Sequence, residues 1–285
     1  MKITPKKEKW ATARGATMQG TPLIPPQEAE RLYRVAMQKA IQRMTKAYGK
    51  ELEATIKPFA TAADSGVAMD ANLGSQLDLM FGRLNKHWGK VFGKLARTLA
   101  KTTVSRVDRL SKRRLDQSLK ELSGGLTIKT PELPESMIST LQAATARNVG
   151  LIKSIQSKFH EQIAQEVLNN IGDQQAVYEN AKKLVSRVYF HGETTEERAR
   201  LIARDQVSKM SSEMSAARAR SAGITKFKWR HSGASNEPRK LHLQHNNQIF
   251  DFDNPPVIEE DGTRGLPGIS VNCRCVMVPI VDFGE

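Results

Sequence analysis

The chain has 285 residues, of which 39% are hydrophobic, and its formal net charge is +14. This composition is typical of a globular protein with one large or two ordinary domains, and it excludes a disordered chain. No apolar run is long enough to span a bilayer and no apolar stretch follows the charged N-terminus, so we expect neither a membrane partner nor a secretory signal. The two cysteines stand one residue apart, which excludes a disulfide framework.

The positive charge is concentrated in the N-terminal half of the chain. Residues 1–130 contain 25 Lys and Arg against 11 Asp and Glu, whereas residues 131–285 contain 19 of each kind. Charge segregated in this way favours a polyanionic partner, and nucleic acid is the commonest one. A well-solvated helical surface with a role in solubility is the alternative.

Residues 1–26 form a basic arm that contains four prolines, so we expect it to be extended, either disordered or along a partner. Apolar residues at helical spacing predict a helical region over residues 27–190. Its helices are expected at 27–56, 72–122, 135–171 and 174–190, with a loop at 58–71. A capping box from Thr194 to Glu197 predicts that a new helix starts there and runs to about residue 222.

The predicted helix at 72–122 has an apolar side and a strongly basic opposite side. A helix of this kind packs on a core and presents its charge outward. We therefore predict that its basic face contacts double-stranded DNA without sequence specificity. The predicted DNA-contacting residues are Arg83, Lys86, Lys90, Lys94, Arg97, Lys101, Arg106, Arg109, Lys112, Arg113 and Arg114.

After Gly223 the pattern becomes strand-like. Alternation around Phe227 and Trp229 predicts a strand, and further short strands are expected at 249–252 and 276–281, with a turn at 239–247. The predicted fold class is α+β, with a long helical N-terminal part followed by a small α+β C-terminal domain, residues 191–285, that has a few short strands.

Cys273 and Cys275 suggest a metal site. In an extended segment, residues i and i+2 project to the same face, so the two thiols can share an ion. His242 and His245 share a face of a helical turn, and two thiolates with two imidazoles suit zinc. His231 is the other candidate for the fourth position. The alternative is that both cysteines are buried packing residues and His242 is a hydrogen-bonded structural histidine.

Two catalytic interpretations remain open at this point. His242 and His245 together with Asp251 and Asp253 form the residue set of a metal-dependent nuclease, although no catalytic signature surrounds them. Arg204 and Asp205 lie on an amphipathic helix, where an internal ion pair that docks the helix on the strands is the favoured interpretation. Arg239 and Arg274 flank the cysteines and are candidates to bind phosphate. For Asn272 and Arg274, which are expected to point away from the cysteines, the favoured interpretation is that they fix the loop to its neighbours.

The C-terminal part resembles the phage Mu F-like minor head proteins, also called phage head morphogenesis proteins. The resemblance covers roughly residues 150–281 and is most specific at the Asn-Cys-Arg-Cys tetrapeptide before the last strand. The chain departs from the family pattern at Asp205-Gln206, where Thr-Glu is usual, and at Asn246-Asn247. The residues that carry the resemblance are Arg204, Trp229, Arg239, His242, Asn272, Cys273, Arg274 and Cys275.

The resemblance implies a minor capsid protein of the virion, inside the capsid near the portal, that acts in head morphogenesis, DNA packaging or DNA delivery. The implied partners are the portal protein, major capsid or scaffold proteins and DNA, and assembly takes place in the host cytoplasm. It implies no enzymatic activity. The alternatives are a metal-dependent nucleic-acid-modifying enzyme centred on the His/Cys cluster, or a DNA-binding or condensing protein without a capsid role. We further expect the N-terminal part to engage the portal and residues 195–285 to fold independently of residues 1–56.

Overall fold

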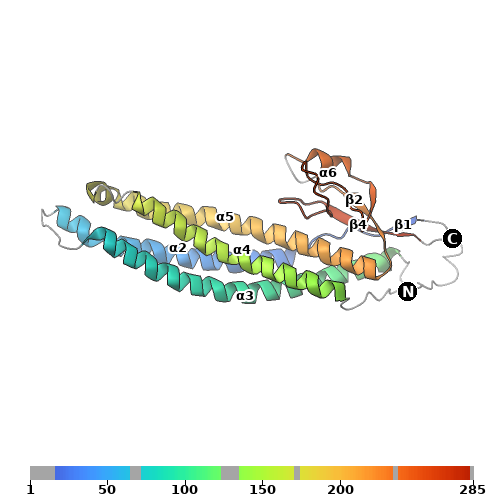
Figure 1. Ribbon diagram of the computed structural model, residues 1–285, viewed down its shortest axis with the longest axis horizontal. Helices are drawn as coiled ribbons and strands as arrows, with labels where there is room; N and C mark the ends of the chain where they lie inside the picture. Colours follow the sequence, from blue (N-terminus) through green and yellow to red (C-terminus); the bar gives the residue numbers. More distant parts are fainter. Residues whose placement is uncertain (1–16, 65–71, 123–134, 170–173, 234–236, 283–285) are drawn as a thin grey trace. The chain divides into compact units, whose positions relative to one another are not determined.

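The computed structural model describes residues 17–64, 72–122, 135–169, 174–233 and 237–282 (Figure 1). Long helices and a small antiparallel sheet make up these residues, which confirms the predicted α+β class. None of the described helices is long and apolar enough to cross a membrane. The elements are β1 Thr17–Gln19, α2 Gln27–Asp64, α3 Leu73–Leu122, α4 Glu135–Leu168, α5 Gln174–Ser221, β2 Lys226–Arg230, α6 Lys240–Gln244, β3 Ile249–Asp251 and β4 Val276–Asp282.

The chain forms two compact units, and each is built from separated stretches of sequence. We call Leu32–Ala100 with Arg147–Ile202 the helical unit. The sheet unit comprises the described residues of Met1–Arg31, Lys101–Ala146 and Ala203–Glu285. The boundary expected between residues 190 and 191 falls inside α5, and the first part of α3 belongs to the helical unit while its last part belongs to the sheet unit.

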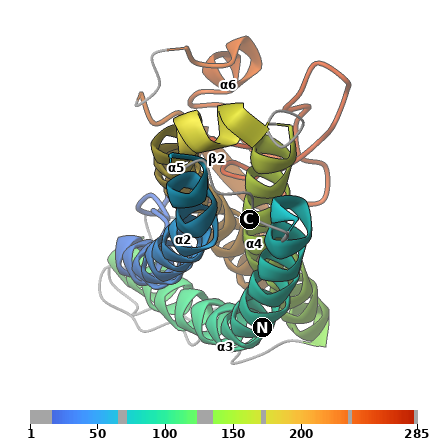
Figure 2. The same cartoon turned by 90° about the vertical axis from the view of Figure 1, so that its left-hand side faces the viewer.

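In the helical unit, segments of α2, α3, α4 and α5 lie side by side (Figure 1, Figure 2). Aromatic residues fill its core: the ring of Tyr48 lies 5.2 Å from that of Phe159 and 6.5 Å from that of Phe81. The buried Tyr33 hydroxyl donates to Asn148 at 2.6 Å, so the polar group of the core has a partner. The apolar residues whose spacing predicts these helices are therefore the ones that form the buried faces.

The helix α2 is longer than the sequence predicts. It continues through Pro58 to Asp64, where a loop was expected from residue 58. Phe59 is 5% exposed and extends the buried face of Leu52 and Ile56 by another turn. Burial of that ring offsets the backbone hydrogen bond that Pro58 cannot make.

The prediction of two helices around Thr194 is wrong, because α5 runs unbroken from Gln174 to Ser221. The hydroxyls of Thr194 and Thr195 donate back to the carbonyl of His191 instead of capping a new helix. Gly192 lies against Thr45 of α2, whose side chain would be only 2.6 Å from a Cβ at this position. The glycine therefore permits close packing of α5 on α2.

The sheet has the strand order β1-β4-β2-β3, with all neighbours antiparallel. Trp229 pairs with Met277 and Phe227 with Pro279, so the alternate residues of β2 point into the core. This core is continuous with the end of α3, the end of α5 and both cysteines. Its members include Leu115, Leu119, Ala216, Ala219, Phe227, Trp229, Phe252, Cys273, Cys275 and Met277.

The described residues of the N-terminal arm do not lie free of the chain. Residues 17–19 form the edge strand β1, and the backbone N–H groups of Gly20 and Leu23 donate to Pro279 and Met277 at 2.9 Å. The hydroxyl of Ser118 on α3 bonds both the N–H and the carbonyl of Thr21. Residues 17–24 are therefore part of the sheet unit, while the rest of the predicted arm, residues 1–16, lies outside the described residues.

Candidate metal centre

His242 enters the core of the sheet unit from the short helix α6. Its side chain is 3% exposed, and its ring centroid lies 5.2 Å from that of Trp229. Its Nε2 lies 3.1 Å from the carbonyl oxygen of Ile258. Because a carbonyl oxygen only accepts, this contact assigns the proton of the neutral ring to Nε2. Nδ1 therefore carries a lone pair.

Both cysteine thiols face that lone pair. The Nδ1 atom lies 3.4 Å from Sγ of Cys273 and 3.7 Å from Sγ of Cys275, and both cysteines are free and buried. Within the described part of the chain, these three side chains are the group of His, Cys, Asp or Glu whose ligand atoms all lie within 4.8 Å of one another. The spacing Cys-x-Cys thus brings the two thiols together as the sequence predicts.

The loop that carries the cysteines is held by α5. The backbone N–H of Asn272 donates to the Asp205 carboxylate at 3.0 Å, and the Arg204 guanidinium donates to the side-chain oxygen of Asn272. Asn272 has a φ of 60°, a left-handed conformation that asparagine tolerates better than most residues. The expectation is an ion pair that docks the helix on the strands, whereas Arg204 and Asp205 each bond Asn272 and so connect α5 to the cysteine loop.

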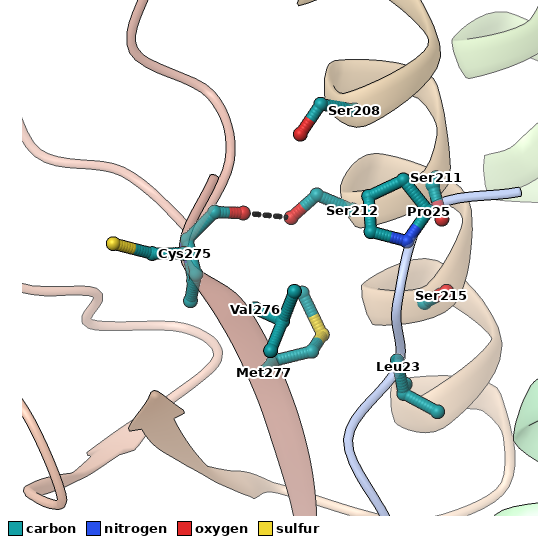
Figure 3. Close-up of a pocket in the computed structure, with 10 residues that line it drawn as sticks. Leu23, Pro25, Ser208, Ser211, Ser212, Ser215, Cys275, Val276 and Met277 are labelled. Atoms are coloured by element: carbon teal, nitrogen blue, oxygen red, sulfur yellow. Dashed lines mark hydrogen bonds between the residues drawn. The ribbon is translucent and has the colours of Figure 1, made fainter. Parts of the chain in front are cut away.

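Gly268 brings the same loop close to α5. Its φ is 85°, and a Cβ there would lie 2.7 Å from Oγ of Ser208 and 3.3 Å from the carbonyl oxygen of Cys275. A second contact is the Ser212 hydroxyl, which donates to the Pro267 carbonyl at 2.7 Å. Figure 3 shows that the sulfur of Cys275 points away from the serines of α5. The pocket on the serine side has a volume of only about 10 Å³ and is a packing interface.

The two thiols affect each other's protonation. A hydrogen bond from Cys275 lowers the pKa of the Cys273 thiol far below its ordinary value. The hydrogen bond to Cys273 and burial raise the pKa of Cys275. Burial raises the pKa of Asp205, while the Asn272 N–H and the Arg204 charge act in the opposite direction. The cluster therefore favours a thiolate at one of the two cysteines even when no cation is bound.

The predicted fourth ligand His245 is not part of this cluster. Its Nε2 bonds the carbonyl of Val257 at 2.7 Å, and its ring packs against Trp229 and Phe250. His245 directly follows α6 and still has a helical backbone conformation. The indole of Trp229 therefore contacts both histidine rings, with centroid distances of 5.2 Å to His242 and 5.4 Å to His245. The two histidines share a face of the turn, as predicted, yet they bond different carbonyls of the 257–258 segment.

The residue set of the nuclease interpretation is also not assembled. Asp253 pairs with Arg220 at 2.9 Å, and Asp251 is an exposed residue of β3. Neither belongs to the group of potential metal ligands around His242.

An open pocket of about 480 Å³ adjoins the cluster. His242 and both cysteines lie in its wall together with His231, whose Nδ1 accepts a hydrogen bond from the N–H of Gly233 at 3.1 Å. Arg239 and Arg274 also line this pocket, and Arg239 pairs with Glu259 at 3.3 Å. The pocket thus gives solvent a route to the three buried ligand atoms.

The predicted DNA-contacting residues fall into two groups on α3. The first six, Arg83 to Lys101, are exposed, and because they recur every three or four residues they lie within about 80° of the helix circumference. The later ones are more dispersed: Lys112 pairs with Asp116 at 3.2 Å, and Arg106 is half-buried. Arg114 is partly buried and donates to the carbonyl of Ile24, so it holds the N-terminal segment.

Two features were missed at the sequence level. Arg218 of α5 has a side chain only 1% exposed and pairs with Asp108 of α3 at 2.5 Å, which no pattern in either helix indicates. A second exposed basic line on α2, namely Lys39, Arg43, Lys46 and Lys50, has the same helical spacing as the line on α3. Its spacing is readable in the sequence, since no acidic residue lies between residues 31 and 50.

Comparison with known proteins agrees with the geometry. The family described as phage Mu protein F like protein matches residues 158–278, which confirms the resemblance over this part of the chain. An uncharacterized protein of Haemophilus influenzae is 33% identical over 196 residues, which cover 67% of this chain and 40% of that protein. The chain thus spans less than half the length of this relative. No solved structure matches the chain. The family implies a role in phage head morphogenesis.

Proposed function

We propose that this chain is a minor capsid protein of a phage virion that acts in head morphogenesis. The observation that carries this proposal is the family assignment of residues 158–278. In support, residues that carry the resemblance converge from α5, β2, α6 and the cysteine loop on one folded site: Arg204 bonds Asn272, and Trp229 packs on His242 beside both cysteines. Assembly takes place in the host cytoplasm.

The proposed partner is the portal protein, with the chain inside the capsid beside it. This part rests on the resemblance. The test is to assemble heads from the portal, major capsid and scaffold proteins of the same phage together with this chain, and to repeat the assembly without portal. We expect the chain to sediment with portal-containing heads and to be absent from portal-free shells when both are measured by quantitative mass spectrometry. Equal amounts in both would place its docking on the capsid or scaffold proteins, and absence from both would refute the head role.

The proposed contact with DNA is electrostatic and runs along the first six cations of the predicted set, Arg83 to Lys101. Five of them are exposed on the helical unit part of α3, and Lys101 continues the line at the next turn. Lysine and arginine side chains that line one face of a helix can neutralise successive phosphates, which gives affinity without sequence preference. The salt dependence of binding is therefore the measurement that reports this contact.

We propose that the role is structural and not enzymatic. The acidic residues of the nuclease interpretation lie apart from His242, which supports this proposal. A cleavage assay on supercoiled and linear DNA with Mg²⁺, Mn²⁺ and Zn²⁺ is the test, and we expect the DNA to remain intact. Cleavage that is lost in a His242→Ala variant would refute the structural role and establish the enzyme alternative.

A further inference from the structure

We propose that His242, Cys273 and Cys275 bind a zinc ion, whose fourth coordination position faces the pocket lined by His231. This inference goes beyond the proposed head role and does not depend on it. In a tetrahedral zinc site, with Zn–S near 2.3 Å and Zn–N near 2.0–2.1 Å, a sulfur and a nitrogen ligand lie roughly 3.5 Å apart. The two N···S distances here are 3.4 and 3.7 Å, so Nδ1 already has the separation from each sulfur that the ion requires, and all three ligand atoms lie within 4.8 Å of one another.

The histidine is oriented as a metal ligand. Its Nε2–H points at the Ile258 carbonyl, which fixes the ring and leaves the Nδ1 lone pair directed at the two sulfurs. A ligating histidine in proteins almost always has such a second hydrogen bond to a carbonyl or carboxylate. The contact with Trp229 restricts the ring from the side. Without this support the ring would lose the orientation that aims Nδ1 at the thiols.

A backbone N–H group points at one of the two sulfurs. The backbone N–H of Cys275 donates to Sγ of Cys273 at 3.4 Å. The indole N–H of Trp229 is buried without a hydrogen-bond partner. N–H groups stabilise negative sulfur, which is the form that binds metal. Two thiolates with one imidazole are soft ligands that select zinc over magnesium or calcium.

Such an ion would join three segments of the sheet unit. It would tie α6 to the loop of Cys273 and to the residue before β4, and it would close a loop between residues that are 31 positions apart. A crosslink of this kind stabilises the folded state by limiting the unfolded chain. The remaining coordination position lies toward the open pocket, whose wall contains all three ligands. His231 lines the same pocket but is not among the side chains whose ligand atoms converge, so water can complete the tetrahedron.

The test begins with the full-length wild-type protein, purified under reducing conditions without chelator. We expect about one zinc per chain by elemental analysis. After removal of zinc, titration with Co²⁺ is expected to give the intense visible bands of a tetrahedral site and a thiolate-to-cobalt band in the near ultraviolet. The proposal would be overturned by a protein that contains no zinc and gives neither of these cobalt bands. The same three side chains would then be linked by weak S–H hydrogen bonds.

Matched variants locate the ion. A Cys273→Ser, Cys275→Ser double variant and a His242→Ala variant should lose the metal and the cobalt bands. A His245→Gln variant is the control, since His245 also packs on Trp229 but is not a ligand, and it should retain both. A His231→Ala variant should retain them as well. Loss of metal in His245→Gln to the same extent as in His242→Ala would show that the metal does not bind at this cluster, and loss in His231→Ala would overturn the open fourth position.

Discussion

The backbone N–H of Asn272 donates to the carboxylate of Asp205 at 3.0 Å, and this bond is one of those that join the cysteine loop to α5. An Asp205→Ala variant leaves that N–H without its acceptor, and we expect it to lower the free energy of unfolding by about 1–3 kcal/mol. An Asp205→Asn variant keeps an acceptor oxygen and removes the desolvated charge, so its loss should be clearly smaller. Urea unfolding at pH 7, followed by circular dichroism, measures both. Equal losses would show that the charge of Asp205, not its acceptor, holds the loop.

The contact between Gly192 and Thr45 predicts an unusual glycine effect. Alanine normally stabilises the interior of a helix by about 1 kcal/mol relative to glycine. At Gly192, however, the new Cβ would lie 2.6 Å from Thr45, so we expect a Gly192→Ala variant to be destabilised by about 1–3 kcal/mol. Gly82→Ala on α3 is the control, because nothing lies within 4 Å of that Cβ, and it should raise the midpoint of thermal unfolding.

The second arm of that test removes the obstacle. A Thr45→Ala, Gly192→Ala double variant should recover most of the stability that the single glycine variant loses. If the double variant is as unstable as the single one, the helices are not brought close by this glycine.

These elements also show what could be read from the sequence and what could not. Phe227 and Trp229 alternate with polar residues, so β2 was predictable, and the tetrapeptide around Cys273 located the cluster. The Thr194–Glu197 capping box predicted a helix start that does not form, because a local signal cannot report that Thr45, almost 150 positions earlier, packs on Gly192. The edge strand β1 was missed for the same reason, since its pairing with β4 joins opposite ends of the chain.

The ion pair between Arg187 and Glu166 predicts a dependence of stability on pH. Hydrogen bonds from Arg187, with a further contribution from His191, lower the pKa of the Glu166 carboxyl in the folded state. The proton is therefore bound more weakly by the folded than by the unfolded chain, and the stabilisation is present above the ordinary carboxyl pKa and is lost as the pH falls through the folded value. Both partners are partly exposed, so we expect Glu166→Gln to cost only about 0.2–1 kcal/mol at neutral pH. Urea unfolding measured from pH 7 downward should show that the difference in unfolding free energy between the wild type and Glu166→Gln shrinks. A Glu193→Gln variant at an exposed position is the control, and it should not differ from the wild type in unfolding free energy over this pH range.

The exposed line of cations on α3 predicts a specific loss of DNA binding. Reversal of Lys90, Lys94, Arg97 and Lys101 to glutamate should weaken binding to a double-stranded fragment and reduce the slope of log K against log salt by about 3–4, because each phosphate contact contributes about 0.9. The control reverses Lys39, Arg43, Lys46 and Lys50 of α2, which changes the net charge equally and has the same helical spacing. Fluorescence anisotropy at several salt concentrations measures both variants. An equal effect of the two would show that net charge, and not the α3 face, determines binding.

The packing of the N-terminal segment revises the expectation that residues 195–285 fold independently of residues 1–56. Leu23 is 5% exposed in the core of the sheet unit, and its N–H donates to Met277 of β4, so this segment completes the sheet rather than extending from it. A Leu23→Ala variant should lose about 2–4 kcal/mol, whereas the same change at the neighbouring Ile24, 48% exposed, should cost less than about 0.5 kcal/mol. Limited proteolysis reports the consequence directly, since residues 195–285 should become sensitive to protease in the Leu23 variant and in a chain that lacks residues 1–56. Continued resistance in the truncated chain would mean that β4 and β2 hold the sheet without the N-terminal strand, and that the unit folds independently after all.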